Sequence, residues 1–121
     1  MAAPNLANIS TITAKSVQAA LTTTLTTEIL ANASSSNKVF KINNIIVANI
    51  DGTNAADASV AITKSGGSPI MIASTVSVPA DATLVVVDKN TALYLEEGDN
   101  IEAGASAASD LTITINYEEL S

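Results

Sequence analysis

The sequence predicts an all-β fold, an antiparallel β-sandwich of jelly-roll or immunoglobulin-like type with about eight or nine short strands. Three observations support this prediction. Ala, Thr, Ser, Ile and Val dominate the chain of 121 residues. Apolar and polar residues alternate at a period of two in several segments, and turn-forming residues recur at intervals of ~8–12 residues.

The first ten residues differ from the rest of the chain. They have no sustained period and contain Pro4, which favours an extended N-terminal arm (residues 1–10) followed by a single domain (residues 11–121). Residues 14–21 favour a strand, with a short helix as the alternative. Residues 22–30 alternate small polar residues with Leu25 and Ile29 and predict a second strand, and residues 32–37 have the composition of a loop.

Residues 38–51 predict the strand around which the fold is organised, because this segment alternates at a period of two, is rich in β-branched residues and exceeds the usual strand length of ~5–6 residues. One face of the alternation carries the residues expected in the core, namely Phe40, Ile42, Ile46, Ala48 and Ile50. The other face mixes apolar with polar residues, namely Val39, Ile45 and Val47 with Lys41, Asn43 and Asn49. A core on one face and a partial cover on the other indicate a central strand.

The second half of the chain predicts shorter strands. Ser65-Gly66-Gly67-Ser68-Pro69 is the strongest turn signal and predicts a hairpin between residues 59–64 and 70–75. Residues 83–88 are too apolar to alternate, which is typical of a strand covered on both faces. Further strands are expected at residues 91–96, 101–105 and 111–117. The last of these alternates most regularly.

The charge of the chain argues against nucleic acid as a direct partner. The formal net charge is −7, five lysines are the only basic residues, and there is no arginine. A protein that binds phosphates needs a basic surface, which this composition does not supply.

The residue types also argue against catalysis and cofactors. Without cysteine or histidine the chain forms no disulfide, lacks the commonest zinc ligands and has no histidine to activate a serine. We therefore expect no enzyme activity and no cofactor. The N-terminus lacks the features of an export signal, and no apolar run approaches the ~20 residues of a membrane span, so we expect a soluble protein without a membrane partner.

One acidic cluster has two interpretations. Glu96, Glu97, Asp99 and Glu102 fall within seven positions, and carboxylates around a turn are calcium ligands in many proteins. However, the order of an EF-hand loop is absent. The preferred interpretation is a solvated acidic turn that keeps a sheet edge from pairing, without a metal.

Several turn and strand-end segments resemble a family of small virion structural proteins of tailed bacteriophages, especially those of marine and cyanobacterial hosts. The resemblance covers residues 39–120. Its most characteristic segments are Ile50-Asp51-Gly52-Thr53, Val78-Pro79-Ala80-Asp81-Ala82-Thr83, Leu95-Glu96-Glu97-Gly98-Asp99 and Tyr117-Glu118-Glu119.

The resemblance implies a non-enzymatic part of a virion that is assembled in the cytoplasm of the bacterial host. A capsid decoration (cement) protein that bridges neighbouring capsid subunits is the expected role, with the major capsid protein or other virion proteins as partners and a homo-oligomer, preferably a trimer. A tail, neck or fibre component is the alternative. A cell-surface or carbohydrate-binding module is a third, which the scarcity of aromatic residues weakens. Within the arm, Leu6 and Ile9 are the candidate partner contacts, because apolar side chains gain nothing if left in water.

Overall fold

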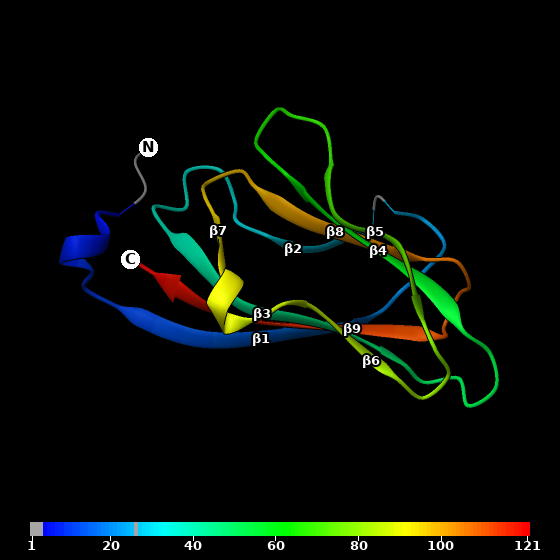
Figure 1. Ribbon diagram of the computed structural model, residues 1–121. Coiled ribbons are helices and arrows are strands. Elements are labelled where there is room, and N and C mark those ends of the chain that lie inside the picture. The colour runs from blue at the N-terminus through cyan, green and yellow to red at the C-terminus, as the bar shows by residue number, and fades with distance from the viewer. Residues whose placement is uncertain (1–3, 26) are drawn as a thin grey trace.

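The computed structural model describes residues 4–25 and 27–121, and they form two antiparallel sheets packed face to face (Figure 1). This confirms the predicted β-sandwich. One sheet has the order β1-β9-β3-β6, with β7 also paired to β3, and the other has the order β2-β8-β4-β5. The strands are β1 (Ile12–Ala20), β2 (Thr27–Ala31), β3 (Val39–Asn49), β4 (Ala56–Thr63), β5 (Ile70–Val78), β6 (Thr83–Val87), β7 (Leu93–Leu95), β8 (Asn100–Ala105) and β9 (Leu111–Leu120).

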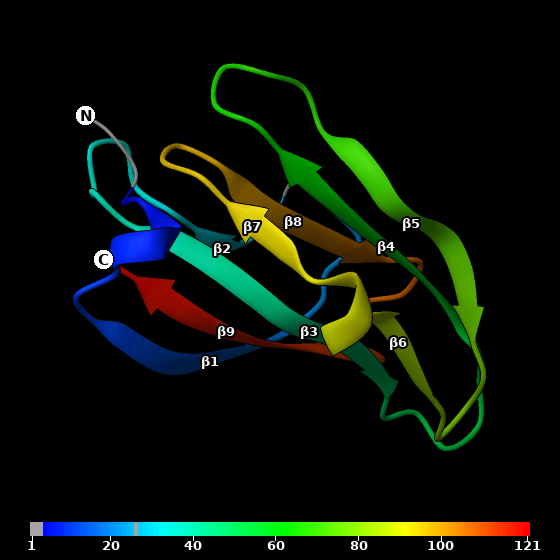
Figure 2. The same cartoon turned by 60° about the vertical axis from the view of Figure 1, so that its left-hand side comes forward.

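The order of the strands is that of a jelly roll. Strand β1 pairs with β9, β2 with β8, β3 with β6 and β4 with β5, so the pairs are nested around the β4–β5 connection. One long hairpin that rolls up into two sheets produces this nesting. Strand β7 is an addition that lies against β3 beyond the end of β6 (Figure 2). Of the two predicted sandwich types, the strand order therefore selects the jelly roll.

Strand β3 is central, as predicted, but only two of its five predicted core residues are correct. Its pairing with β9 skips Asn43, so that a β-bulge separates residues 39–42 from residues 44–49. A bulge of one residue inverts the alternation of side chains. Phe40 and Ile42 face the core as expected, whereas Ile45 and Val47 replace Ile46 and Ala48 there, and Ile50 is 62% exposed.

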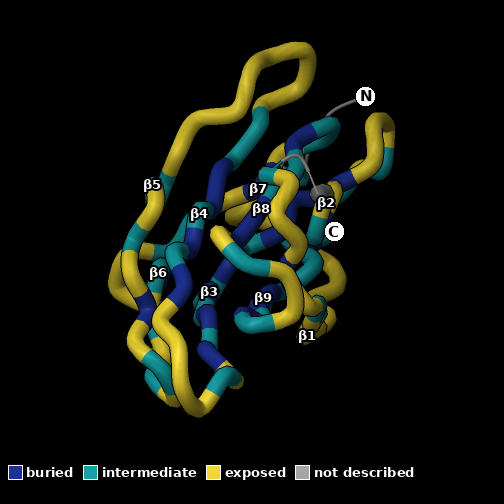
Figure 3. Tube along the Cα trace, turned by 90° about the vertical axis from the view of Figure 1, so that its right-hand side faces the viewer, coloured by how far each residue is buried: buried dark blue, intermediate teal, exposed yellow. Residues whose placement is uncertain are grey.

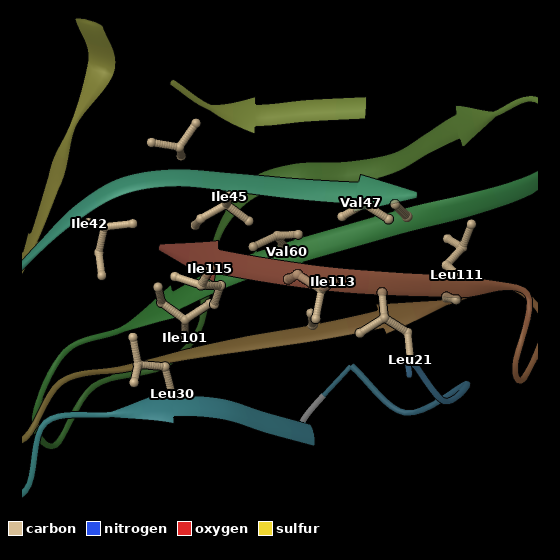
Figure 4. Close-up of a cluster of buried hydrophobic side chains, with 14 of the residues drawn as sticks. Leu21, Leu30, Ile42, Ile45, Val47, Val60, Ile101, Leu111, Ile113 and Ile115 are labelled. Carbon is tan, nitrogen blue, oxygen red and sulfur yellow. The ribbon is translucent and has the colours of Figure 1, made fainter. Parts of the chain in front are cut away.

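The core lies between the two sheets and is built from aliphatic side chains. Figure 4 shows Ile45 and Val47 of β3 beside Ile113 and Ile115 of β9, with Val60 of β4 and Ile101 of β8 from the opposite sheet. All six are fully buried. At one end of the core the rings of Phe40 and Tyr117 are in contact, with 5.1 Å between their centroids.

Two further predictions need correction. Residues 83–88 were expected to be covered on both faces, but β6 pairs with β3 alone, and Val85 is 57% exposed. A strand of residues 22–30 was expected, but β2 begins only at Thr27. Within that predicted strand, Thr26 lies outside the described residues.

The segment before β2 crosses from one sheet to the other and passes very close to β8. A Cβ atom at Gly104 would lie 2.9 Å from Cα of Leu25, so this crossing requires a glycine in β8. Leu21 is buried at the start of the crossing. The Thr-rich segment before Thr27 is therefore a connection between the two sheets and not part of a longer strand.

The remaining elements agree with the predictions within a few residues. Strand β1 replaces the alternative helix, and β4 and β5 form the predicted hairpin, whose turn projects from the sandwich as an exposed loop (Figure 3). A 3-10 turn (Lys89–Thr91) precedes the short β7. In the described part of the chain, no helix has the length and apolar character needed to cross a membrane.

Candidate interaction surface

Strand β1 forms an open and regular edge of the sandwich. Its nine residues pair with β9 without any shift in register, and β1 ends the order of its sheet. The other edge strands that pair over more than three residues, β2, β5 and β6, all contain irregularities in their pairing. Irregular pairing hinders the addition of another strand, and β1 lacks this protection.

The pair Thr11–Ser121 shows which backbone groups of β1 bond to β9 and which point to the open edge. Thr11 and Ser121 exchange both backbone hydrogen bonds, at 2.8 Å and 2.9 Å. Since hydrogen-bonded and non-hydrogen-bonded pairs alternate in an antiparallel ladder, the odd-numbered residues of β1 bond to β9. The N–H and C=O groups of the even-numbered residues therefore point away from β9, towards the open edge. These residues are Ile12, Ala14, Ser16, Gln18 and Ala20.

The side chains of β1 leave this edge accessible. Residues 12–16 are all exposed, although alternate residues of a sandwich strand normally face the core. Ile12 is 61% exposed. The only charged side chain of β1 is Lys15. Residues 12–20 include neither proline nor glycine and only one charge, so β1 lacks the residues that commonly protect an edge strand from pairing.

The N-terminal segment lies beside the end of this sheet. Leu6 belongs to a 3-10 turn (Leu6–Asn8), which Asn5 caps by accepting a hydrogen bond from the N–H of Ala7. Leu6 is 52% exposed, and Ile9 is partly buried. The predicted arm therefore contains one helical turn among its described residues, while residues 1–3 lie outside them.

A shallow depression separates this segment from β3 and β7. It has a volume of about 290 Å³ and is lined by Pro4, Leu6, Val39, Tyr94 and Glu96. Leu6 thus contributes to a small apolar surface with the 44% exposed Tyr94, and Ile9 does not line it. The role of Leu6 and Ile9 in binding a partner stays a prediction.

The acidic residues of the β7–β8 turn have different partners, although Glu96 and Asp99 both contact the ammonium group of Lys64. Asp99 is buried, and its carboxylate accepts hydrogen bonds from the Lys64 ammonium group and from the N–H groups of Ser65 and Glu96. Glu97 instead accepts from the N–H of Asn37 at 3.1 Å. Among residues 4–25 and 27–121, no three acidic side chains are grouped closely enough to hold a metal ion.

This arrangement changes the interpretation of the acidic turn. Asp99 is not solvated but is an internal anchor that ties the β4–β5 hairpin to the β7–β8 turn. The hydrogen bond to Asp99 raises the pKa of Lys64 above its ordinary value, partial burial opposes this shift, and Glu96 adds to it. The positive charge of Lys64 is thereby held next to a buried negative charge.

A second group of charges lies near the end of β9. The Glu119 carboxylate, with only 13% of its side chain exposed, contacts the ammonium groups of Lys15 at 3.4 Å and Lys38 at 3.0 Å. Burial alone would raise the pKa of Glu119, but the two lysines outweigh it, so the pKa lies below its ordinary value. Lys15 therefore links the open edge strand to β9.

The four segments that carry the resemblance lie as two pairs, one at each end of the sandwich. At one end the N–H of Asp81 donates to the C=O of Asp51, and the buried Asn49 side chain donates to the C=O of Val78. At the other end Leu95 and Glu119 flank Phe40 on neighbouring strands. These segments thus build the ends of the sandwich.

Comparison with known proteins adds no relative to this description. Neither the models of protein families nor the curated proteins contain a match to this chain. Functional inference therefore rests on the residues and on their arrangement.

Proposed function

We propose that this protein is a non-enzymatic structural component of a bacteriophage virion, and specifically a capsid decoration protein that bridges neighbouring capsid subunits. The observation that carries the proposal is the set of large apolar side chains that the fold leaves in solvent. Leu6, Ile12, Ile50, Ile70 and Val85 are each more than half exposed. Exposed apolar side chains gain free energy when another protein covers them, so these residues are the candidate contacts with neighbouring subunits.

The fold is compatible with this role. Jelly rolls occur in viral capsid proteins and in lectins, although a fold alone does not determine a function. Lectins commonly stack sugars on aromatic rings, and this chain has three aromatic residues. Of these, Phe40 and Tyr117 are buried in the core. The scarcity of exposed aromatic rings therefore favours the virion role over sugar binding.

The charged groups support a structural role. The carboxylates of Asp99 and Glu119 are engaged by lysines. These acids stabilise the ends of the sandwich and are not positioned as an acid and base pair around a cavity. A general acid or base must reach its substrate, and neither group is free to do so.

The proposal is tested by locating the protein in purified particles. Cryo-electron microscopy of the virion, combined with quantitative mass spectrometry against the major capsid protein, gives both the position and the copy number. A decoration protein is expected on the outer shell in numbers comparable with the capsid subunits. A low copy number at a vertex or on the tail would favour the alternative role as a tail, neck or fibre component, and absence from particles would contradict both.

A further inference from the structure

The open edge of β1 has unpaired backbone N–H and C=O groups that another strand can bind. Exposed edges of this length and regularity pair with other chains unless they are blocked, and β1 contains no proline and no bulge. We propose that β1 pairs in antiparallel fashion with β1 of a second copy of this protein, around a two-fold axis, so that the two sheets continue as one. This inference depends on the geometry of the edge and not on the virion role.

A second copy fits this edge better than the other strands of the molecule do. A strand that pairs along all of β1 must itself be regular over the same length and must present outward N–H and C=O groups at alternate residues. Strands β2, β5 and β6 are interrupted by shifts in register, whereas β1 itself meets both conditions. A two-fold contact then uses the same surface on both copies.

The charge of Lys15 selects the register. An axis at Lys15 would place two ammonium groups directly opposite each other, which is unfavourable across a strand pair. An axis at Ser16 instead sets Lys15 opposite Val17 of the second copy and pairs all residues from Ile12 to Ala20. The five even-numbered residues of each strand then exchange about ten backbone hydrogen bonds.

This register also covers exposed apolar surface. Ile12, which is 61% exposed, lies opposite Ala20 of the second copy, so part of its side chain is covered. The outward face around the axis carries the small side chains of Ala14 and Ser16, which do not obstruct the approach of a second sheet. The result is a dimer, which differs from the trimer that the resemblance implies.

The mass of the protein in solution tests the dimer. The chain has a mass of 12.2 kDa, and native mass spectrometry and sedimentation velocity of the purified full-length protein are expected to show twice this value. A monomer or a trimer at all concentrations would overturn the proposal. A monomer that binds only an extended segment of another virion protein would assign the edge to that partner and would also overturn it.

Charge substitutions at the axis test the register. Ser16→Lys and Ser16→Glu each place like charges opposite each other, so each variant alone is expected to dimerise at least tenfold more weakly than the unmodified protein. A mixture of the two variants is expected to restore the dimer, because opposite charges then meet across the axis. The N–H and C=O of Ser16 point away from β9, so neither change disturbs the backbone ladder with β9. The one bond lost within the fold is the exposed hydrogen bond that the Gln18 side-chain amide donates to the Ser16 hydroxyl.

Thr114→Lys provides the matched control, because Thr114 lies on the same face of the sheet but on the interior strand β9. Circular dichroism verifies that all variants are folded. Dimerisation that is unchanged in Ser16→Lys, or weakened equally by Thr114→Lys, would contradict a contact through β1. Failure of the mixture to dimerise would contradict the register with its axis at Ser16.

Discussion

At the scale of single residues, Asp99 is the only acidic residue that is buried in the described part of the chain. It accepts one charged and two backbone hydrogen bonds from Lys64, Ser65 and Glu96. The neighbouring Gly98 also packs closely against the β4–β5 turn. Its φ is +86°, and an added Cβ would lie 2.7 Å from Oγ of Ser65. The turn is therefore specified by residues that face the protein and not the solvent.

Replacing Asp99 tests this role. Asp99→Ala leaves Lys64 and two N–H groups without their acceptor, and it is expected to lower the free energy of unfolding by about 2–4 kcal/mol. Denaturation in urea measures the change. Glu97→Gln is the matched control in the same turn, with an expected cost below about 1 kcal/mol because its partner N–H is exposed. Equal costs for the two variants would show that Asp99 is not an anchor.

The pH dependence of stability tests the Glu119 ion pairs. The pKa of Glu119 is lower in the folded state than its ordinary value of 4.5, so its ionised form stabilises the fold. This contribution is fully present above the unfolded pKa and is lost as the pH falls through the folded pKa. Glu119→Gln is therefore expected to reduce stability at neutral pH and to flatten the loss of stability below about pH 4.5.

Urea denaturation over a series of acidic buffers measures this difference. Glu118→Gln is the control, because Glu118 is the neighbouring acid on the other face of β9 and makes no ion pair among the described residues. If the two variants show the same pH dependence, the lysines around Glu119 do not stabilise the fold.

At the scale of elements, β3 shows how one extra residue changes the assignment of a core. The bulge at Asn43 keeps Phe40 and Ile42 inside but exchanges Ile46 for Ile45 further along the strand. The amide of Asn44 accepts a hydrogen bond from the Asn116 side chain at 2.7 Å just beyond the bulge. This contact holds the displaced half of β3 against β9.

A matched pair of substitutions tests the inverted alternation. Ile45 is fully buried, and Ile45→Ala is expected to cost ~2–5 kcal/mol of stability, as for other large-to-small changes in a core. Ile46 is only partly buried, so Ile46→Ala is expected to cost less than about half as much. Denaturation curves of the two variants measure the loss of stability. A larger loss for Ile46→Ala than for Ile45→Ala would show that the bulge is not at Asn43.

At the scale of the whole molecule, the N-terminal segment is attached to the sandwich by few contacts. The turn at residues 6–8 buries no side chain, and Ser10 makes one backbone hydrogen bond, to Ser121. The segment is nevertheless next to the apolar depression and lies at the end of the sheet, beside the start of β3 (Figure 2). It is therefore placed to contact a neighbouring molecule without being needed for folding.

Removal of residues 1–10 tests this separation. The truncated protein is expected to melt within about 5 °C of the full chain, because a loss of roughly 1 kcal/mol shifts the melting temperature of a domain of this size by a few degrees. Its incorporation into particles is expected to fall, since Leu6 and Ile9 are removed. A truncated protein that does not fold, or that enters particles at full occupancy, would contradict this role.

Much of the fold, but little of the candidate surface, could be predicted from the sequence. Leu111, Ile113, Ile115 and Tyr117 alternate so regularly that β9 and its core face follow from local periodicity. The same reasoning failed for β6, because an apolar run does not tell a strand covered on both faces from an exposed edge strand. The edge at β1 was missed for a related reason, since the sequence does not show which strands have two neighbours.

Residue types and local spacing are enough to predict the all-β class and the approximate positions of the strands, and to exclude histidine and cysteine chemistry. The tertiary structure decided the jelly-roll order, the phase of β3 after Asn43, the pairing of Asp99 with Lys64, and the open edge of β1. Each of these depends on contacts between residues far apart in the chain, and only the packing of two sheets brings those residues together.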